Sequence, residues 1–206
     1  VGFKLIHAFC MQNDIALSKI TEYLDLLTIS IGADIVPMTG ENRVFSFYGL
    51  KQINSNPRNG IKALMEIANK TSNLSVSDVV FGIAPRINAA GRIDHAKKAV
   101  EILVENDYEK AKSLAVSIER NNLTRRGLDQ NITEEALEMI DKTKKSTVVF
   151  SENWHKGVVG IVASRLIETH YKPTIVFSEN NAIHTRSFSH KVRCQQTLVS
   201  NYKFEN

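Results

Sequence analysis

One strand–helix–strand unit constrains the fold of this chain more than any other feature. The apolar run at residues 147–150 is followed by a polar turn at 153–157, an amphipathic segment and a second apolar run at 173–177. This alternation is typical of a parallel sheet in an α/β fold. It predicts that His155 and Gly157 lie at the N-terminus of the intervening helix.

Such a helix terminus is a favourable place for an anion. It presents unpaired backbone N–H groups and a partial positive charge. Gly157 lets a bound group approach the backbone closely, and His155 adds a side-chain donor. The alternative interpretation is a polar loop that only caps the helix, with Trp154 as its anchor in the core. Further along the helix, Arg165 suits the rim of an amphipathic surface.

A second segment, at residues 81–94, places two arginines and an asparagine on an apolar background. Its sequence is Phe-Gly-Ile-Ala-Pro-Arg-Ile-Asn-Ala-Ala-Gly-Arg-Ile-Asp. The small residues around Arg86, Asn88 and Arg92 predict a compact turn that directs guanidinium groups at one target. Guanidinium groups suit phosphate because they donate two parallel hydrogen bonds. The alternative is a set of turn contacts with a salt bridge between Arg92 and Asp94.

The rest of the chain has mostly helical patterns. Residues 3–80 are predicted to be mainly helix, beginning with one apolar face formed by Phe3, Leu5, Ile6, Phe9 and Cys10. Ser75 and Asp78 have the spacing of a capping box. Residues 96–140 have a helical pattern with one break at 106–107, and their modest apolar content indicates a connector between two lobes. The periodicity is lost after Glu179.

Bulk composition excludes some classes of protein and leaves others open. The chain has 206 residues, of which 43% are hydrophobic and 23% charged, as is usual for a globular protein. The net charge of +4 is compatible with a polyanionic partner. No run of residues is apolar enough to span a membrane. The two cysteines, Cys10 and Cys194, form no pairing motif, so a reducing cytoplasm is expected. A start at Val1 suggests a piece of a longer protein.

Taken together, these segments resemble a known family. The 81–94 and 153–165 segments, with Gly-Ala-Asp-Ile-Val-Pro-Met-Thr-Gly-Glu-Asn-Arg at 32–43, are similar to the RecJ family of single-strand-specific DNA exonucleases, within the DHH phosphoesterase superfamily. The resemblance covers residues 1–180. It implies an α/β fold in three parts: residues 1–95 as the C-terminal, mostly helical part of a DHH catalytic lobe with the arginine turn, 96–145 as a connector helix, and 146–206 as a partial DHH-associated lobe.

The resemblance also implies a metal ligand. From spacing alone, Asp34 is a helix cap or a solvated carboxylate. In the family, the matching aspartate is one ligand of a two-metal cluster, for which Mn²⁺ or Mg²⁺ is suited. The sequence departs from the family because it contains no Asp-x-Asp motif and no His-His pair. We therefore expect this chain to hold an incomplete cluster and to be inactive alone.

Contacts to the nucleic acid follow from the same resemblance. Single-stranded DNA is the implied substrate, and His155 is the implied catalytic residue among those present. The segment His184-Thr-Arg-Ser187 resembles a short family strand near the 5′ phosphate, although the Gly-Ser before that strand and a later Gly-Gly-His turn are absent. The implied contacts to phosphate or to the strand are Arg86, Asn88, Arg92, His155, Gly157, Ser164, Arg165 and Arg186.

The implied function is 5′→3′ hydrolysis of single-stranded DNA in repair and recombination, in the cytoplasm, with a single-strand-binding protein as a further partner. Two alternatives differ in class. A DHH-family phosphoesterase for oligonucleotides or nucleotides would share the metal chemistry, but it usually has a shorter linker than residues 96–140. A non-catalytic nucleic-acid-binding module is the other, since DHH-associated lobes also occur in alanyl-tRNA synthetases. The end of the chain, residues 181–206, matches the family poorly.

Overall fold

The computed structural model describes residues 1–70, 73–180 and 183–189. The chain divides into an N-terminal unit, Val1–Arg125, and a C-terminal unit, Arg126–Asn206. Their boundary falls inside one long helix, α9 (Tyr108–Glu138), which passes without a break through Gly127. Across the described residues, the helices lack the combination of length and apolar character that a membrane span needs.

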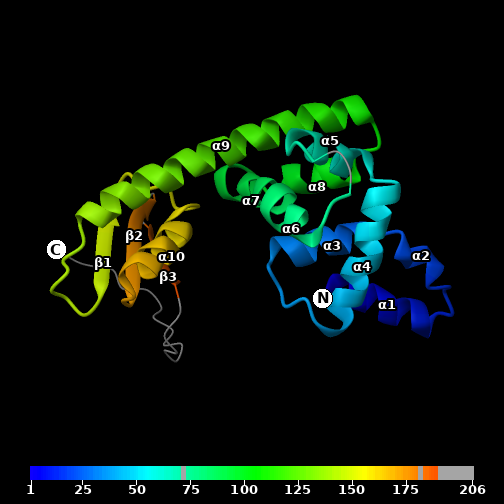
Figure 1. Cartoon of the computed structure of the whole chain (residues 1–206), viewed down its shortest axis with the longest axis horizontal. Helices are drawn as coiled ribbons and strands as arrows, with labels where there is room; N and C mark the ends of the chain where they lie inside the picture. Colours follow the sequence, from blue (N-terminus) through cyan, green and yellow to red (C-terminus); the bar gives the residue numbers. More distant parts are fainter. Residues whose placement is uncertain (71–72, 181–182, 190–206) are drawn as a thin grey trace. The chain divides into compact units, whose positions relative to one another are not determined.

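Helices make up the described part of the N-terminal unit (Figure 1). A π-helical turn, η1, joins α6 to α7, so residues 76–93 form one continuous helical segment. Before α9, the elements are α1 (Gly2–Gln12), α2 (Ser18–Thr21), α3 (Leu24–Ala33), α4 (Gly40–Ser55), α5 (Asn59–Ile67), α6 (Val76–Asp78), η1 (Val79–Ile83), α7 (Ala84–Ile93) and α8 (Lys97–Val104).

The core of this unit is built from aliphatic residues on several helices. Ile29, Ile53, Leu64 and Ile83 are among its fully buried members. The first half of α9 joins the same cluster through Ala111, Ala115 and Ile118. Their spacing of three to four residues places them on one face of the helix. The predicted connector of residues 96–145 therefore comprises α8, the first half of α9 in this core, and a second half in the C-terminal unit.

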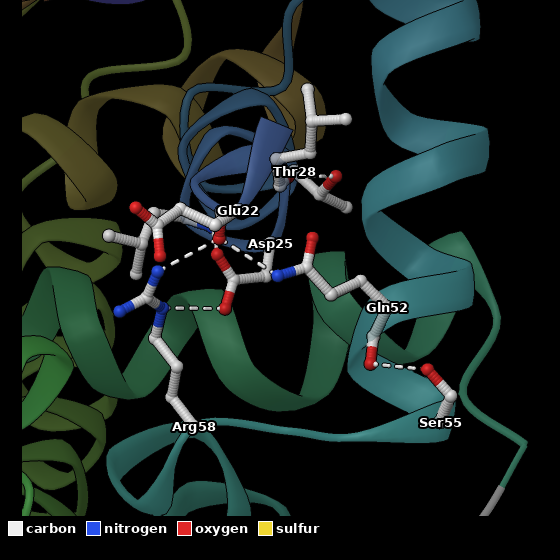
Figure 2. A network of polar contacts seen from close by, with 8 residues as sticks. Glu22, Asp25, Thr28, Gln52, Ser55 and Arg58 are labelled. Atoms are coloured by element: carbon white, nitrogen blue, oxygen red, sulfur yellow. Dashed lines mark hydrogen bonds and ion pairs between the residues drawn. The ribbon is translucent and has the colours of Figure 1, made fainter. Parts of the chain in front are cut away.

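A buried carboxylate fixes the junction of α2 and α3 (Figure 2). Asp25 is fully buried and accepts a hydrogen bond from Arg58 Nε at 2.7 Å. Arg58 also donates to the carbonyl oxygen of Glu22, to which Gln52 donates as well. Gln52 lies near the end of α4, and Arg58 is the residue before α5. The network therefore connects α4 and the start of α5 to the junction of α2 and α3. A buried charge needs such partners to offset its lost hydration.

Two glycines permit close packing in this unit. A Cβ atom at Gly49 would lie 2.1 Å from the carbonyl oxygen of Leu24, and one at Gly60 would lie 1.7 Å from that of Ile102. Both contacts are with backbone atoms, which cannot easily move aside. The absence of a side chain therefore allows α4 to approach α3, and α5 to approach α8.

The C-terminal unit contains the predicted strand–helix–strand unit. Strand β1 (Thr147–Ser151) pairs in parallel with β2 (Thr174–Asn180), with Thr147 opposite Thr174. Helix α10 (Val159–His170) lies between them in sequence and packs against the sheet (Figure 1). Its buried residues are Val159, Val162, Ala163, Leu166 and Ile167. This parallel unit confirms the prediction from the apolar runs.

One strand was expected only from the family resemblance of residues 184–187, not from their sequence pattern. Strand β3 (Ile183–Ser189) pairs antiparallel with β2, so that the order in the sheet is β1-β2-β3. The pattern after Glu179 has too little alternation to indicate it. Backbone pairing along β2 defines the strand instead. Residues 181–182 and 190–206, the remainder of the poorly matching end, lie outside the described residues.

Local helix signals had mixed outcomes. The capping box is confirmed, since the Ser75 side chain accepts from the backbone N–H of Asp78 and the Asp78 side chain accepts from that of Ser75. The apolar face of α1 is not a buried face, because only Cys10 on this helix is buried. Phe3 instead packs edge-on against Phe45 of α4. The spacing of apolar residues predicted α1 as a helix but did not predict how much of its apolar face is buried.

Candidate nucleic-acid interface

The segment predicted as an arginine turn is helical, which corrects that prediction. Residues 84–93 form α7, and η1 precedes it directly. Pro85 lies within the first two positions of α7. It has no backbone N–H to donate to the preceding turn, and that turn is the π-helical η1. Ala84, Ala89 and Ala90 are buried, so the small residues serve close helix packing and not a turn.

Arg86 projects from α7 onto α9. Its Nε lies 2.7 Å from Oε2 of Glu119, and an Nη2–H donates to Oε1 at 3.1 Å. An Nη1–H donates to the carbonyl oxygen of Gly82 at 2.6 Å. The side chain of Arg86 is only 15% exposed. Hydrogen bonds use two of the five guanidinium N–H donors, and Nε is buried in ionic contact with Glu119 without a hydrogen bond. The phosphate contact predicted for Arg86 stays a prediction for the second N–H of Nη1 and of Nη2.

Asn88, Asp34 and Arg92 are all exposed in this unit. Asn88 donates from Nδ2 to the carbonyl oxygen of Ala33 at 3.1 Å, which brings it beside the end of α3. Asp34 is the C-terminal cap residue of α3. The structure therefore brings two of the predicted site residues together, although fifty-five positions separate Asn88 from Ala33.

Asp94, which was considered as a salt-bridge partner of Arg92, forms its salt bridge with a lysine. Asp94 pairs with Lys98, one turn later in sequence. The hydrogen bond from Lys98, followed by one from the backbone of His95, holds the pKa of Asp94 below its usual value. The carboxylate of Asp94 is thus engaged by Lys98, and Arg92 stays a predicted strand contact.

In the C-terminal unit, the loop between β1 and α10 carries the predicted catalytic histidine. Trp154 is 3% exposed, which confirms its expected burial. Its indole Nε1–H donates to Oε2 of Glu135, on α9, at 2.7 Å. His155 and Gly157 are half-buried, and Lys156 is exposed. Helix α10 begins at Val159, so His155 and Gly157 lie four and two residues before the helix and not in its first turn.

A hydrogen bond within the loop engages one of the two ring nitrogens of His155. The backbone N–H of Gly157 donates to His155 Nδ1 at 3.1 Å. An acceptor nitrogen carries no hydrogen, so in this contact the ring hydrogen lies on Nε2. Nε2 is then a hydrogen-bond donor, suited to an oxygen of a phosphate group. The N–H of Gly157 is engaged within the loop, and the strand contact expected for Gly157 stays a prediction.

Arg165 lies on α10 and pairs with a carboxylate of α9. Its Nη2 lies 2.7 Å from Oδ2 of Asp129. The Asp129 side chain is 2% exposed and the Arg165 side chain 52% exposed. Ser164 donates from Oγ to the carbonyl oxygen of Gly160 within the same helix. About half of the Arg165 side chain therefore stays at the surface.

Arg186 is placed by its backbone. It lies on β3, opposite Phe177 of β2. This position agrees with the strand expected for the 184–187 segment. The phosphate contact expected for Arg186 stays a prediction.

Sequence patterns did not indicate the residues that hold these groups. Glu119, Asp129 and Glu135 all belong to α9, and each contacts one of the predicted site segments. Their partners lie 33, 36 and 19 positions away in sequence. In a charge-rich helix, acidic residues are expected on a solvated face. Nothing in the local pattern distinguishes these three from their neighbours.

Asp34 alone does not fit a two-metal centre. Such a centre requires several carboxylate or imidazole ligands around each ion. Among the residues that the structure describes, no three His, Cys, Asp or Glu side chains gather where a metal ion would be held.

Comparison with known proteins shows that the chain is similar to RecJ proteins. No family model matches it. The single-stranded-DNA-specific exonuclease RecJ of Escherichia coli (strain K12) is 36% identical over 176 residues, which cover 81% of this chain and 30% of that protein. RecJ of Bacillus subtilis (strain 168) is 37% identical over 180 residues, covering 85% and 22%. The chain therefore spans less than a third of the length of these relatives.

Solved structures that resemble this chain are RecJ proteins too. RecJ from Thermus thermophilus in complex with Mg²⁺ has a TM-score of 0.79 at 32% identity, covering 86% of this chain and 28% of that one. An exonuclease RecJ bound to manganese has a TM-score of 0.77 at 32% identity, covering 86% and 45%. These similarities confirm the predicted resemblance and the predicted α/β fold class.

Proposed function

Because the chain belongs to the RecJ family, we propose that it is part of a 5′→3′ exonuclease that hydrolyses single-stranded DNA. The observation that carries the proposal is the presence of two suitable donors in the C-terminal unit. His155 Nδ1 accepts a hydrogen bond from the Gly157 N–H, which leaves Nε2 to donate, and Arg165 exposes half of its side chain. Both groups suit the oxygens of a phosphodiester.

The N-terminal unit supplies the other proposed contacts. Asn88 and Arg92 are exposed on α7, and Asn88 is held beside the end of α3. A guanidinium and an amide on one helix are suited to positioning a strand by its backbone. Arg86 is proposed to contribute through its two remaining N–H donors. Gly157, Ser164 and Arg186 complete the proposed set, on the loop, on α10 and on β3.

Metal ions enter the proposal through Asp34. Its exposed carboxylate suits Mg²⁺ or Mn²⁺, the ions bound in the similar structures. When bound, two such ions would supply an activated water and neutralise charge on the scissile phosphate. The rest of the ligand set would come from residues other than the described ones. We therefore propose that this chain alone is inactive and that the longer protein acts in cytoplasmic DNA repair and recombination, with a single-strand-binding protein as partner.

The two alternative functions predict different observations. A phosphoesterase for short oligonucleotides or nucleotides would release product from a dinucleotide as well as from a long strand. Helix α9, at 31 residues, favours the RecJ alternative because such phosphoesterases usually have a short linker. A non-catalytic module would bind single strands and have no activity even within the longer protein.

The test is a nuclease assay on two proteins. The chain alone and the longer protein that contains it are each incubated with a 5′-labelled single strand and Mn²⁺. We expect nucleotide release by the longer protein only. Release by the chain alone would show that Asp34 is not part of an incomplete centre, and an inactive longer protein would leave the binding-module alternative.

A second assay addresses Asp34 directly. In the longer protein, Asp34→Ala is expected to abolish cleavage and to leave strand binding largely unchanged, because a metal ligand acts on the transition state while cationic side chains supply affinity. Asp14→Ala, at an exposed aspartate of the same unit, is the matched control. Cleavage at a near-normal rate by the Asp34 variant would return Asp34 to the role of a helix cap.

A further inference from the structure

The loop that carries His155 is anchored to α9 by its neighbour, Trp154. The loop spans residues 152–158, between the end of β1 and the start of α10. Its backbone hydrogen bonds are short-range: Trp154 N–H donates to the Ser151 carbonyl and Val158 N–H to that of His155. These bonds shape the loop without linking it to α9. The indole of Trp154 makes that connection, with its ring in the core and Nε1 2.7 Å from Glu135.

Glu135 is chemically suited to this task. A buried indole N–H needs an acceptor, and an ionised carboxylate gives a shorter and stronger hydrogen bond than a neutral group does. Glu135 itself is exposed, so its carboxylate stays hydrated on one side and loses little hydration energy. The bond therefore fixes the direction of the indole with little opposing desolvation. Because His155 is the next residue, the direction of the indole also limits where the imidazole can lie.

Asp129 acts in the same way on α10. It lies on the face of α9 that also carries the buried residues Ile132 and Ala136. Its Oδ2 holds the guanidinium of Arg165, while its Oδ1 is buried without a hydrogen-bond partner among the described residues. A buried carboxylate with one oxygen that accepts no hydrogen bond destabilises the fold. The ion pair with Arg165 offsets that destabilisation.

We propose that Glu135 and Asp129 are positioning residues, which set the places of His155 and Arg165 on a common support, the second half of α9. The inference rests on the proposed function, because it assumes that His155 and Arg165 contact the DNA strand. Helix α9 is then more than a link between two units. It is the part of the C-terminal unit that determines the spacing of two donors for phosphate.

The anchor can be followed spectroscopically, because Trp154 is the only tryptophan in the chain. We compare the wild-type chain with Glu135→Ala, Glu135→Gln and the control Glu138→Ala, which alters an exposed glutamate one turn further along α9. Glu135→Ala should shift the emission of Trp154 to longer wavelength and increase its quenching by acrylamide. Glu135→Gln keeps an amide oxygen as acceptor and should resemble the wild type, as should Glu138→Ala.

Binding of a single-stranded oligonucleotide to the same four proteins supplies the second measurement. We expect Glu135→Ala to bind about five- to tenfold more weakly, which corresponds to the loss of about one well-placed hydrogen bond. Glu135→Gln should recover most of that affinity. A residue with a merely structural role would not be rescued in both measurements by the same conservative change. Far-ultraviolet circular dichroism checks that each variant is folded.

The outcomes separate the inference from the function on which it rests. Unchanged Trp154 emission in Glu135→Ala would overturn the inference, and so would altered emission with unchanged affinity. In both cases the wild-type chain still binds the oligonucleotide, and the proposed function stands. A wild-type chain that binds no single strand would instead overturn the proposed contacts themselves, and the inference with them.

Discussion

Two arginines pair with carboxylates of α9, and the two pairs differ in how evenly their partners are buried. In the N-terminal unit, Arg86 is 15% exposed and Glu119 22%, so both partners lie mostly inside. In the C-terminal unit, Asp129 is 2% exposed and Arg165 52%. Arg86 meets two carboxylate oxygens and a carbonyl, whereas Arg165 meets the carboxylate of Asp129 through a single oxygen.

The difference shows how one kind of ion pair serves two purposes. Around Arg86, the carboxylate draws the guanidinium inward and locks α7 to α9. At Arg165, the carboxylate is the buried anchor, and the guanidinium extends to the surface. When one partner of an ion pair is removed, the loss of stability depends on how buried the remaining partner is. A charge left in the interior has lost both its hydration and its counter-ion. Arg165 is therefore the arginine better suited to a phosphate.

The largest expected effect is on stability, and it is asymmetric. Arg165→Ala leaves the buried Asp129 unpaired and should lower the free energy of unfolding by about 2–3 kcal/mol, somewhat below the range for fully buried pairs because water reaches the arginine side. Asp129→Ala leaves only a half-exposed guanidinium and should cost about 1 kcal/mol. Urea unfolding, followed by the emission of Trp154, measures both.

The N-terminal pair is the control for this asymmetry. Arg86→Ala and Glu119→Ala should have costs that differ by less than about 1 kcal/mol, since the two partners are similarly buried. If Arg165→Ala and Asp129→Ala lower the free energy of unfolding equally, the proposed difference between the two ion pairs is wrong. A double variant, Arg165→Ala with Asp129→Ala, should be more stable than Arg165→Ala alone, because the stranded charge is gone.

The next effect concerns DNA affinity and its dependence on salt. Arg165→Gln keeps a donor for Asp129 but removes a cation, and it should weaken oligonucleotide binding about tenfold and reduce the slope of log affinity against log salt by about 0.7. Arg86→Gln should change the slope less, because the Arg86 side chain is mostly buried against Glu119 whereas that of Arg165 is half exposed.

Charge-matched controls are Lys145→Gln in the C-terminal unit and Lys19→Gln in the N-terminal unit, both at exposed positions. They show what a single lost charge does outside the proposed contacts. A larger change of slope for Arg86→Gln than for Arg165→Gln would reverse the comparison and favour the N-terminal unit as the main phosphate site.

The smallest effect is on the acid stability of the N-terminal unit alone. Lys70 and then Ser75 donate to the carboxylate of Asp78 and hold its pKa well below the usual value. A carboxylate with a lowered pKa in the folded state stabilises the fold above its unfolded pKa, and this contribution is lost as the pH falls through the folded pKa. Asp78→Asn should therefore be less stable than wild type at neutral pH, with the difference shrinking below about pH 4.

Two probes separate the units in this experiment. Far-ultraviolet circular dichroism reports mostly on the helices of the N-terminal unit, while Trp154 emission reports on the C-terminal unit. Only the first should differ between Asp78→Asn and wild type. A stability difference that stays constant from about pH 7 to about pH 2 would mean that the carboxylate charge does not stabilise this capping box.

Sequence patterns were sufficient where the interaction is local. The strand–helix–strand unit was predicted because apolar runs of strand length flank a helical period, and the capping box because its two residues bond to each other's backbone. The arginine segment was predicted wrongly as a turn. Small residues and a proline are common to turns and to the first turn of a tightly packed helix, and only the neighbours of Ala84, Ala89 and Ala90 distinguish the two.

By itself, the sequence determined the strand–helix–strand order in the C-terminal unit, the RecJ resemblance and the chemical nature of the donors on α7, the 152–158 loop and α10. Only the tertiary structure decided which carboxylate holds which donor and which partner of each pair is buried. Glu119, Asp129 and Glu135 meet partners 19 to 36 positions away. No periodicity within α9 encodes those meetings. Desolvation depends on everything packed around a charge, so the same arginine–carboxylate chemistry encloses Arg86 and leaves Arg165 at the surface.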